Sequence, residues 1–178
     1  YLGGFDPVPF AGAARLLVSP GVAVATPAVA EAMARGVPVW GDIELLARLI
    51  RTPVAAITGS NGKSTVTTLL GEMVERAGLR AAVGGNLGAP ALDFWLAEQR
   101  DAEAAKALDL YVLELSSFQL ETTHSLNARV ATVLNISPDH MDRYESLGDY
   151  IAAKRRIFQG NGTMVVNADD PVVAAMIE

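Results

Sequence analysis

Short apolar runs alternate with amphipathic and polar stretches along most of the chain. An apolar run bounded by turn residues is typical of a buried strand, whereas apolar positions three and four residues apart are typical of a helix. After residue 53, we expect strands from Val54 and at Ala81–Val83, Leu110–Leu115, Val130–Asn135 and Thr163–Asn167. We expect helices from Lys63 to about Ala77, from about Pro90 and over Pro171–Ile177, with a tight loop at Gly84–Gly88.

The first part of the chain shows a shorter version of the same alternation. Thr26 and Pro27 predict a helix N-cap followed by a proline at the first helical position. Gly36 then predicts the end of that helix after Arg35. Strands are expected at Leu16–Ser19 and Val37–Trp40. A helix capped by Asp42 is expected to run to about Ile50, and Arg51–Pro53 is expected to be a linker.

Alternating strands and helices predict an α/β fold with a largely parallel sheet that is flanked by helices. Residues 1–52 are expected to be the end of a small α/β unit, and residues 53–178 are expected to form a second unit that begins at the strand from Val54. Binding sites in such sheets lie beyond the carboxyl ends of the strands.

Composition narrows the class of protein. The chain has 178 residues, 51% of them apolar, a formal charge of −6 and no cysteine. This favours a packed domain over a disordered one and gives no sign of a nucleic-acid partner or a disulfide scaffold. No apolar run or leader pattern indicates a membrane segment. Both ends look cut, because the chain lacks an initiator Met and stops within a helix-like run, so we expect a fragment.

The stretch Val54–Thr65 carries the strongest chemical signal. An apolar strand runs into a glycine-bracketed loop that ends in Lys-Ser-Thr and leads directly into a helix, which is the arrangement of a polyphosphate cradle. The general motif places a glycine five residues before Gly62, where this chain has Ile57, so the loop is the shorter G-x-x-G-K-S. The alternative is a plain strand–helix connection in which glycines only supply positive φ. The expected ATP-binding residues are Gly59, Ser60, Asn61, Gly62, Lys63, Ser64 and Thr65.

Further candidates follow later strands. Glu114 ends an apolar strand, where a carboxylate needs a metal or a cationic partner, and a neighbouring acid often holds Mg²⁺ in phosphate-binding folds. His140 follows another strand end among acidic residues and is a candidate ligand or substrate contact. His124 is expected to be merely exposed. Lys154 lies in a basic helical stretch, and its surroundings alone predict a surface lysine.

Taken together, seven blocks of the chain resemble the Mur ligase family, and its D-glutamate-adding branch in particular. Mur ligases share the short phosphate loop with the folylpolyglutamate synthetases, whereas the block around Glu114 and Gln119 favours the D-glutamate branch. The blocks are Gly41–Leu45, Thr58–Thr68, Gly84–Gly88, Tyr111–Glu121, Asn135–Tyr144, Ala152–Lys154 and Val166–Asp170.

The resemblance implies an ATP-dependent amide ligase of peptidoglycan precursor synthesis. It would phosphorylate the carboxylate of UDP-N-acetylmuramoyl-L-alanine and join the acyl phosphate to D-glutamate. It also implies two Mg²⁺ sites. Ser64 and Glu114 would hold the first ion, and Glu114, His140 and a carbamylated Lys154 would hold the second. The enzyme would be cytoplasmic, and we expect it to be monomeric. The implied catalytic residues are Lys63, Glu114, His140 and Lys154, and the implied substrate contacts are Ser19, Pro20, Gly21, Asn86, Ser116, Gln119 and His140.

The resemblance implies that residues 1–52 are the C-terminal part of a small Rossmann-like domain that binds the UDP-linked substrate, and that residues 53–178 are an incomplete ATP-binding central domain. It also implies missing parts. The start of the uridine-binding domain and the whole C-terminal domain, which binds the amino acid in this family, are absent from the sequence, so we expect the isolated chain to be nearly inactive. Two other readings stay open: a sibling Mur or folylpolyglutamate ligase, and a P-loop NTPase module without ligase chemistry.

Overall fold

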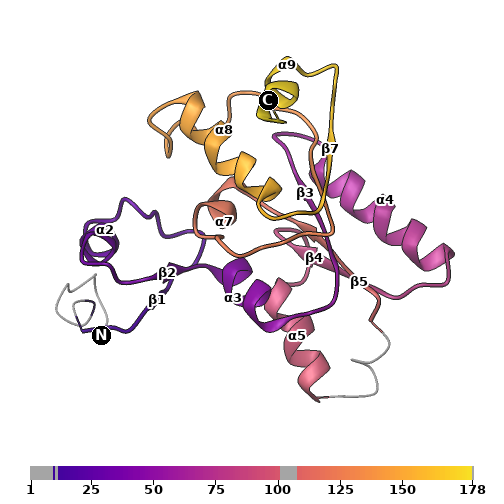
Figure 1. Cartoon of the computed structure of the whole chain (residues 1–178), viewed down its shortest axis with the longest axis horizontal. Coiled ribbons are helices and arrows are strands. Elements are labelled where there is room, and N and C mark those ends of the chain that lie inside the picture. Colours follow the sequence, from indigo (N-terminus) through magenta and orange to yellow (C-terminus); the bar gives the residue numbers. More distant parts are fainter. Residues whose placement is uncertain (1–9, 11, 101–107, 178) are drawn as a thin grey trace.

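A parallel five-stranded sheet forms the centre of the computed structural model, which describes residues 10, 12–100 and 108–177 (Figure 1). The strand order is β4-β5-β3-β6-β7 and every pairing is parallel, which confirms the predicted sheet. The strands are β3 (Val54–Thr58), β4 (Ala81–Gly85), β5 (Leu110–Glu114), β6 (Val130–Val133) and β7 (Thr163–Val166).

Helices cover both faces of the sheet. The long α4 (Lys63–Arg76) packs on β3, β4 and β5 on one side, to the right in Figure 1. The opposite face belongs to the larger apolar core, which also contains side chains of α3 (Asp42–Leu49), α7 (Ser117–Glu121) and the 3-10 turn η1 (Arg156–Phe158). Among the described residues, the remaining helices of this unit are α5 (Ala91–Arg100), α8 (Leu147–Arg155), α9 (Pro171–Ala174) and the 3-10 turn η2 (Ala175–Ile177).

The alternation of side chains along the strands explains the two cores. Ile57 and Val112 point to the α4 side, whereas their neighbours Ala56 and Leu113 point to the larger core. These central strands are buried on both faces, which is why they read as continuous apolar runs in the sequence. The same alternation puts Glu114, two residues after Val112, on the α4 side of the sheet.

A smaller unit precedes the sheet. It consists of β1 (Leu16–Leu17), α2 (Pro27–Ala34) and β2 (Val39–Trp40), with β1 parallel to β2 and its own small apolar cluster. It lies to the left in Figure 1. The helix α3, which we assigned to this first unit, packs instead into the larger core through Ile43 and Leu46. The domain boundary at residue 52 stays a prediction.

Several local expectations need correction. Gly41 is the N-cap of α3, and Asp42 is its first helical residue rather than the cap. The side chain of Thr26 makes no capping hydrogen bond at α2. Gly84 and Gly85, expected in a loop, complete β4, because their backbones pair with β5 next to Glu114. The short helix α7 was not expected, and it depends on a capping box between Ser116 and Gln119.

Candidate functional site

The loop between β3 and α4 has the geometry of an anion-binding site. Gly59 and Gly62 have positive φ angles of 155° and 79°, and Gly62 is the N-cap of α4. No side chain among the described residues caps this helix, so its first amides and the positive end of its dipole face the loop. A side chain at Gly59 would place its Cβ 3.1 Å from that of Leu134. The glycines therefore supply both the positive φ and the space for the close approach.

The loop is braced from behind by the chain that follows β6. The Ser60 amide donates to the Asn135 carbonyl at 3.0 Å, and the Asn61 amide donates to Asn135 Oδ1 at 2.8 Å. Ser60 Oγ lies 2.9 Å from the hydroxyl of Tyr150. Sequence reasoning gave Asn135 and Tyr150 no role. For Asn135 a signal was present, since it follows the carboxyl end of a buried strand.

Two side chains meet at the start of α4 in a way that suits Mg²⁺. Ser64 Oγ donates to Glu114 Oε2 at 2.8 Å, and Glu114 is only 2% exposed. The other carboxylate oxygen accepts from Asn86 Nδ2 at 2.8 Å. Magnesium prefers oxygen ligands and commonly uses one or two protein side chains with water and phosphate oxygens. The oxygen donors present here fit that ion. The alternative was that Glu114 pairs with a nearby Arg or Lys, but the described residues show no ion pair with Glu114.

Lys63 begins α4 beside the same loop. Its Nζ donates to the Ser60 carbonyl at 3.0 Å, and its side chain is half-buried. The ammonium is therefore held over the loop, where it can reach phosphate oxygens.

Lys154 is buried, so the surface-lysine reading of its sequence surroundings is wrong. Only 2% of it is exposed, because α8 turns Tyr150, Ala153 and Lys154 toward the sheet. Its Nζ donates to the Gly59 carbonyl at 2.9 Å and to Thr58 Oγ1 at 3.3 Å. Burial, reinforced by the charge of Lys63, lowers the pKa of Lys154 to about 7. A neutral amine is therefore accessible near neutral pH directly behind the phosphate loop.

His140 lies near this region but is turned toward an aromatic side chain. Its φ is 54°, its ring centroid is 4.7 Å from that of Phe118, and Nε2 is 3.5 Å from Asp139 Oδ2. The part of the chain that the structure describes contains no group of three His, Asp or Glu side chains placed to hold a metal ion. The second metal site, with Glu114, His140 and Lys154 as ligands, stays a prediction.

The expected substrate contacts lie in separate segments of the chain. Ser116 and Gln119 make the capping box of α7, and Gln119 Nε2 also donates to Asp42 Oδ2 at 2.9 Å. Asn86 is exposed next to Glu114. In the loop Ser19–Gly21, the Pro20 carbonyl accepts from Arg143 Nη1 at 3.1 Å, which joins this loop to the chain after His140. Direct contact of any of them with a substrate stays a prediction.

His124 is exposed, as expected, but it is not isolated. Its Nδ1 lies 2.6 Å from Arg156 Nη2, two residues beyond Lys154. Partial desolvation of the ring and the nearby Arg156 charge lower the pKa of His124, which favours the neutral ring that can accept this hydrogen bond.

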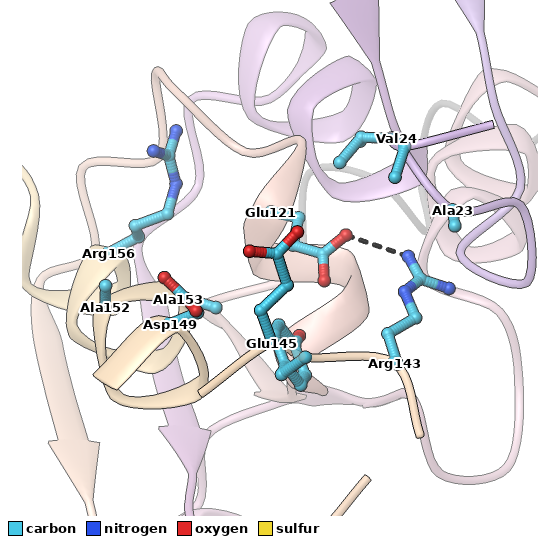
Figure 2. Close-up of a pocket in the computed structure, with 11 residues that line it drawn as sticks. Ala23, Val24, Glu121, Arg143, Glu145, Asp149, Ala152, Ala153 and Arg156 are labelled. Atoms are coloured by element: carbon cyan, nitrogen blue, oxygen red, sulfur yellow. Dashed lines mark hydrogen bonds and ion pairs between the residues drawn. The ribbon is translucent and has the colours of Figure 1, made fainter. Parts of the chain in front are cut away.

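A separate pocket of about 380 Å³ lies beside α8 (Figure 2). It contains none of the expected phosphate, metal or substrate residues. Figure 2 shows the Glu121 carboxylate facing Arg143, a pair at 2.8 Å, with Ala23 and Val24 across from them. The pocket therefore marks the junction between the N-terminal unit and the central sheet. No helix of the described residues is long and apolar enough to cross a membrane.

Comparison with known proteins gives consistent family matches. The model of the Mur ligase middle domain matches residues 57–178. The chain is 58% identical over 177 residues to a protein of Nitrosococcus oceani named UDP-N-acetylmuramoylalanine–D-glutamate ligase. The matched region covers 99% of this chain and 37% of that protein. A protein of the same name from Methylococcus capsulatus is 56% identical over 176 residues, with 99% and 36% covered. The chain thus spans about a third of the length of these relatives.

Solved structures share the fold at low identity. The structure of a UDP-N-acetylmuramoyl-L-alanyl-D-glutamate–2,6-diaminopimelate ligase has a TM-score of 0.59 at 22% identity, over 92% of this chain and 43% of that one. The MurF ligase of Thermotoga maritima, solved in complex with ADP, has a TM-score of 0.52 at 17% identity, over 91% and 48%. At this identity the likeness concerns the fold alone.

Proposed function

The chain belongs to the Mur ligase family, and on this premise we propose that its parent protein is an ATP-dependent ligase that adds D-glutamate to UDP-N-acetylmuramoyl-L-alanine. The contact between Ser64 and Glu114 carries the proposal, because it places a serine hydroxyl and a carboxylate at the N-terminus of α4, beside the loop amides and Lys63. The high identity to relatives of that name supports the choice of substrates.

The proposed reaction explains why cations gather at the loop. A carboxylate is a poor acyl donor, so it first takes the γ-phosphoryl group of ATP, and the amine of D-glutamate then displaces phosphate to form the amide. The substrate carboxylate and the γ-phosphate are both anions, and their approach needs positive charge. Lys63 and the amides of Gly59–Thr65 would bind the phosphates. Ser64 and Glu114 would hold Mg²⁺, which would neutralise further charge on the phosphate oxygens.

Lys154 would have a second role in this proposal. A lysine can form a carbamate with CO₂ only as a neutral amine, and burial lowers the pKa of Lys154 to about 7. The carbamate would turn a cation into an oxygen ligand for a second Mg²⁺, together with Glu114 and His140. Lys154→Ala in the full-length enzyme should therefore abolish turnover, and bicarbonate should stimulate the wild type. Normal turnover of this variant would exclude the carbamate role.

The proposed substrate contacts come from four separate segments of the chain. Asn86, Ser116, Gln119 and His140 would contact the UDP-sugar substrate, and the Ser19–Gly21 loop would contact its uridine part. We further propose that the enzyme acts as a cytoplasmic monomer. Because these relatives are about three times as long, the proposed activity is that of the full-length protein, and the isolated chain should be nearly inactive.

The decisive experiment measures ADP release by the full-length protein with ATP, Mg²⁺ and UDP-N-acetylmuramoyl-L-alanine, with and without D-glutamate. The proposal requires that turnover depend on both co-substrates. An amino-acid panel in the same assay separates the sibling ligases, since only D-glutamate should support turnover. Phosphate release that is indifferent to the UDP-sugar would favour a simple NTPase module instead.

A further inference from the structure

A fully buried carboxylate outside the phosphate site joins α3 to the chain after α7. Glu44 has no exposed surface. Its Oε2 accepts from the amides of His124 at 2.6 Å and Ser125 at 2.8 Å, and its Oε1 accepts from Ser125 Oγ at 2.8 Å and Arg48 Nε at 2.7 Å. Burial alone would raise the pKa of Glu44, but these hydrogen bonds together hold it below the usual value. The group is thus an anion whose acceptor positions are filled by His124 and Ser125 from a distant part of the chain and by Arg48 one turn along α3.

Two further contacts fix the same pair of segments. A Cβ on Gly41 would lie 2.3 Å from Thr122 Oγ1, so the backbone before α3 touches that side chain directly. Asp42 Oδ2 accepts from Gln119 Nε2 at 2.9 Å. The N-cap and first turn of α3 therefore hold residues 116–125, which we name the α7 segment, in its middle and at its end.

The α7 segment is the part of the chain that carries two of the proposed substrate contacts, Ser116 and Gln119. It is also tied to the end of α8, since Arg156 Nε donates to the Leu120 carbonyl at 2.8 Å and Nη2 to the Thr123 carbonyl at 2.8 Å. A shift of this segment would move the substrate contacts relative to the phosphate loop. The loop itself is braced by other residues, on the β6 side of the sheet.

The same carboxylate is also connected to the N-terminal unit, through Arg48. Arg48, which is paired with Glu44, stacks on the ring of Trp40 in β2, with its guanidinium carbon 4.1 Å from the ring centroid. Arg15 stacks on the same ring at 4.3 Å. Glu44 thus lies between β2, which belongs to the unit with the Ser19–Gly21 loop, and the α7 segment.

We propose that Glu44 is a positioning residue that sets the α7 segment, and through it the UDP-sugar contacts, relative to the phosphate loop. The inference rests on the proposed ligase function for its kinetic consequence, but its structural consequence is independent of it. Loss of the Glu44 charge should weaken binding of the UDP-sugar substrate and leave ATP binding unchanged. A merely structural carboxylate would lower stability without separating the two substrates.

The test compares Glu44→Gln with Glu31→Gln in the full-length protein. Glu31 is the matched control, because it also pairs with an arginine four residues later, Arg35, but is exposed on α2. We expect the KM for the UDP-sugar to rise roughly tenfold or more in Glu44→Gln, as for a lost hydrogen-bonded charge, with the KM for ATP changed less than about twofold. Glu31→Gln should change neither. Ser125→Ala removes one donor but keeps the carboxylate, so it should give a smaller change in the same direction even where Glu44→Gln folds poorly.

Amide hydrogen exchange gives the readout that does not need turnover. In Glu44→Gln, the amides of His124, Ser125 and Gln119 should exchange faster, while those of Ser60 and Asn61 in the phosphate loop should not. Unchanged exchange at Gln119, or equal rises in both KM values, would overturn the proposal. If wild-type protein shows no ligation at all, the proposed function fails, and the exchange pattern alone then decides on the positioning role.

Discussion

The two sides of the phosphate loop are built in opposite ways. On the α4 side, the loop presents backbone amides and the half-buried Lys63 from one continuous stretch of sequence. On the α8 side, the buried Lys154 reaches the same loop from far along the chain and donates to the carbonyl of Gly59. One side exposes donors toward a ligand, whereas the other buries a cation against carbonyl and hydroxyl oxygens.

Because of this difference, substitutions on the two sides should affect different properties, ligand binding on one side and fold stability on the other. Charge on the exposed side is solvated until a ligand arrives, so its removal should affect binding and leave the fold intact. Charge on the buried side is desolvated in the folded protein, so its removal should also change stability and its dependence on pH. Matched substitutions on the two sides can therefore test the contrast.

The largest expected effect is that of Lys63→Met on activity. The variant removes the ammonium proposed to contact the phosphates, and turnover of the full-length protein should fall by about 10²–10³-fold, as for loss of a preorganised donor. The melting temperature should change little, because the Lys63 side chain is only half-buried and its ammonium donates to a backbone carbonyl, that of Ser60. Calorimetric ATP binding and thermal unfolding of the same samples check both parts. A fall in melting temperature as large as that of a core substitution would contradict the contrast.

The same change on the buried side, Lys154→Met, should alter the pH dependence of stability. The folded-state pKa of about 7 is below the reference value of 10.5, so between these values the unfolded chain binds more protons and stability rises with pH. Relative to Lys154→Met, the wild type should gain about 1.4 kcal/mol of unfolding free energy per pH unit in this window. Urea unfolding at a series of pH values measures the slope. Parallel pH curves for the two proteins would show that Lys154 is not desolvated as the structure has it.

Replacing the glycines that border the site with alanine should lower the free energy of unfolding by amounts that depend on the atoms around each glycine. A Cβ on Gly85 would lie 2.4 Å from the Glu114 carbonyl oxygen, and the φ of Gly85 is 104°. Gly85→Ala should therefore cost at least about 2 kcal/mol through backbone strain and overpacking, and it should displace the Glu114 strand end. Gly88→Ala is the control, since Gly88 has a φ of 64° but nothing within 4 Å of its Cβ, and it should cost only about 1 kcal/mol. Chemical denaturation of both variants measures the difference, and equal losses would contradict the close packing at Gly85.

The exposed side of the loop could be predicted from the sequence because its parts are adjacent. The strand, the glycines and Lys63 are consecutive, and each local preference agrees with the next. The parallel sheet was also predictable, because strands buried on both faces give continuous apolar runs. Glu114 could be selected for a similar reason, as an acid at the end of such a run.

The buried side could not be predicted in the same way. Nothing local distinguishes Lys154 from a surface lysine in a basic stretch, since its burial depends on how α8 turns toward β3. Only the resemblance to a family singled it out. Glu44 was missed entirely as a functional candidate, because its partners, His124 and Ser125, are remote in the sequence. Tertiary contacts of this kind leave no periodic signal along the chain.

The smallest expected effect is that of His124 on the pH dependence of stability. It tests whether the influence of desolvation and charge on pKa reaches beyond Lys154 to the contact of His124 with Arg156. Partial desolvation and the charge of Arg156 lower the pKa of His124 below the reference value of 6.5, so as the pH falls the unfolded chain takes up a proton before the folded protein does. Stability from the neutral ring is thus present above pH 6.5 and is lost as the pH falls toward the folded-state pKa. His124→Gln keeps an acceptor for Arg156 but does not titrate, so the unfolding free energy of the variant should decline less on acidification. Because the ring is exposed, solvent screening keeps this difference small, and a steeper decline in the variant would show that the folded protein does not lower the pKa of His124.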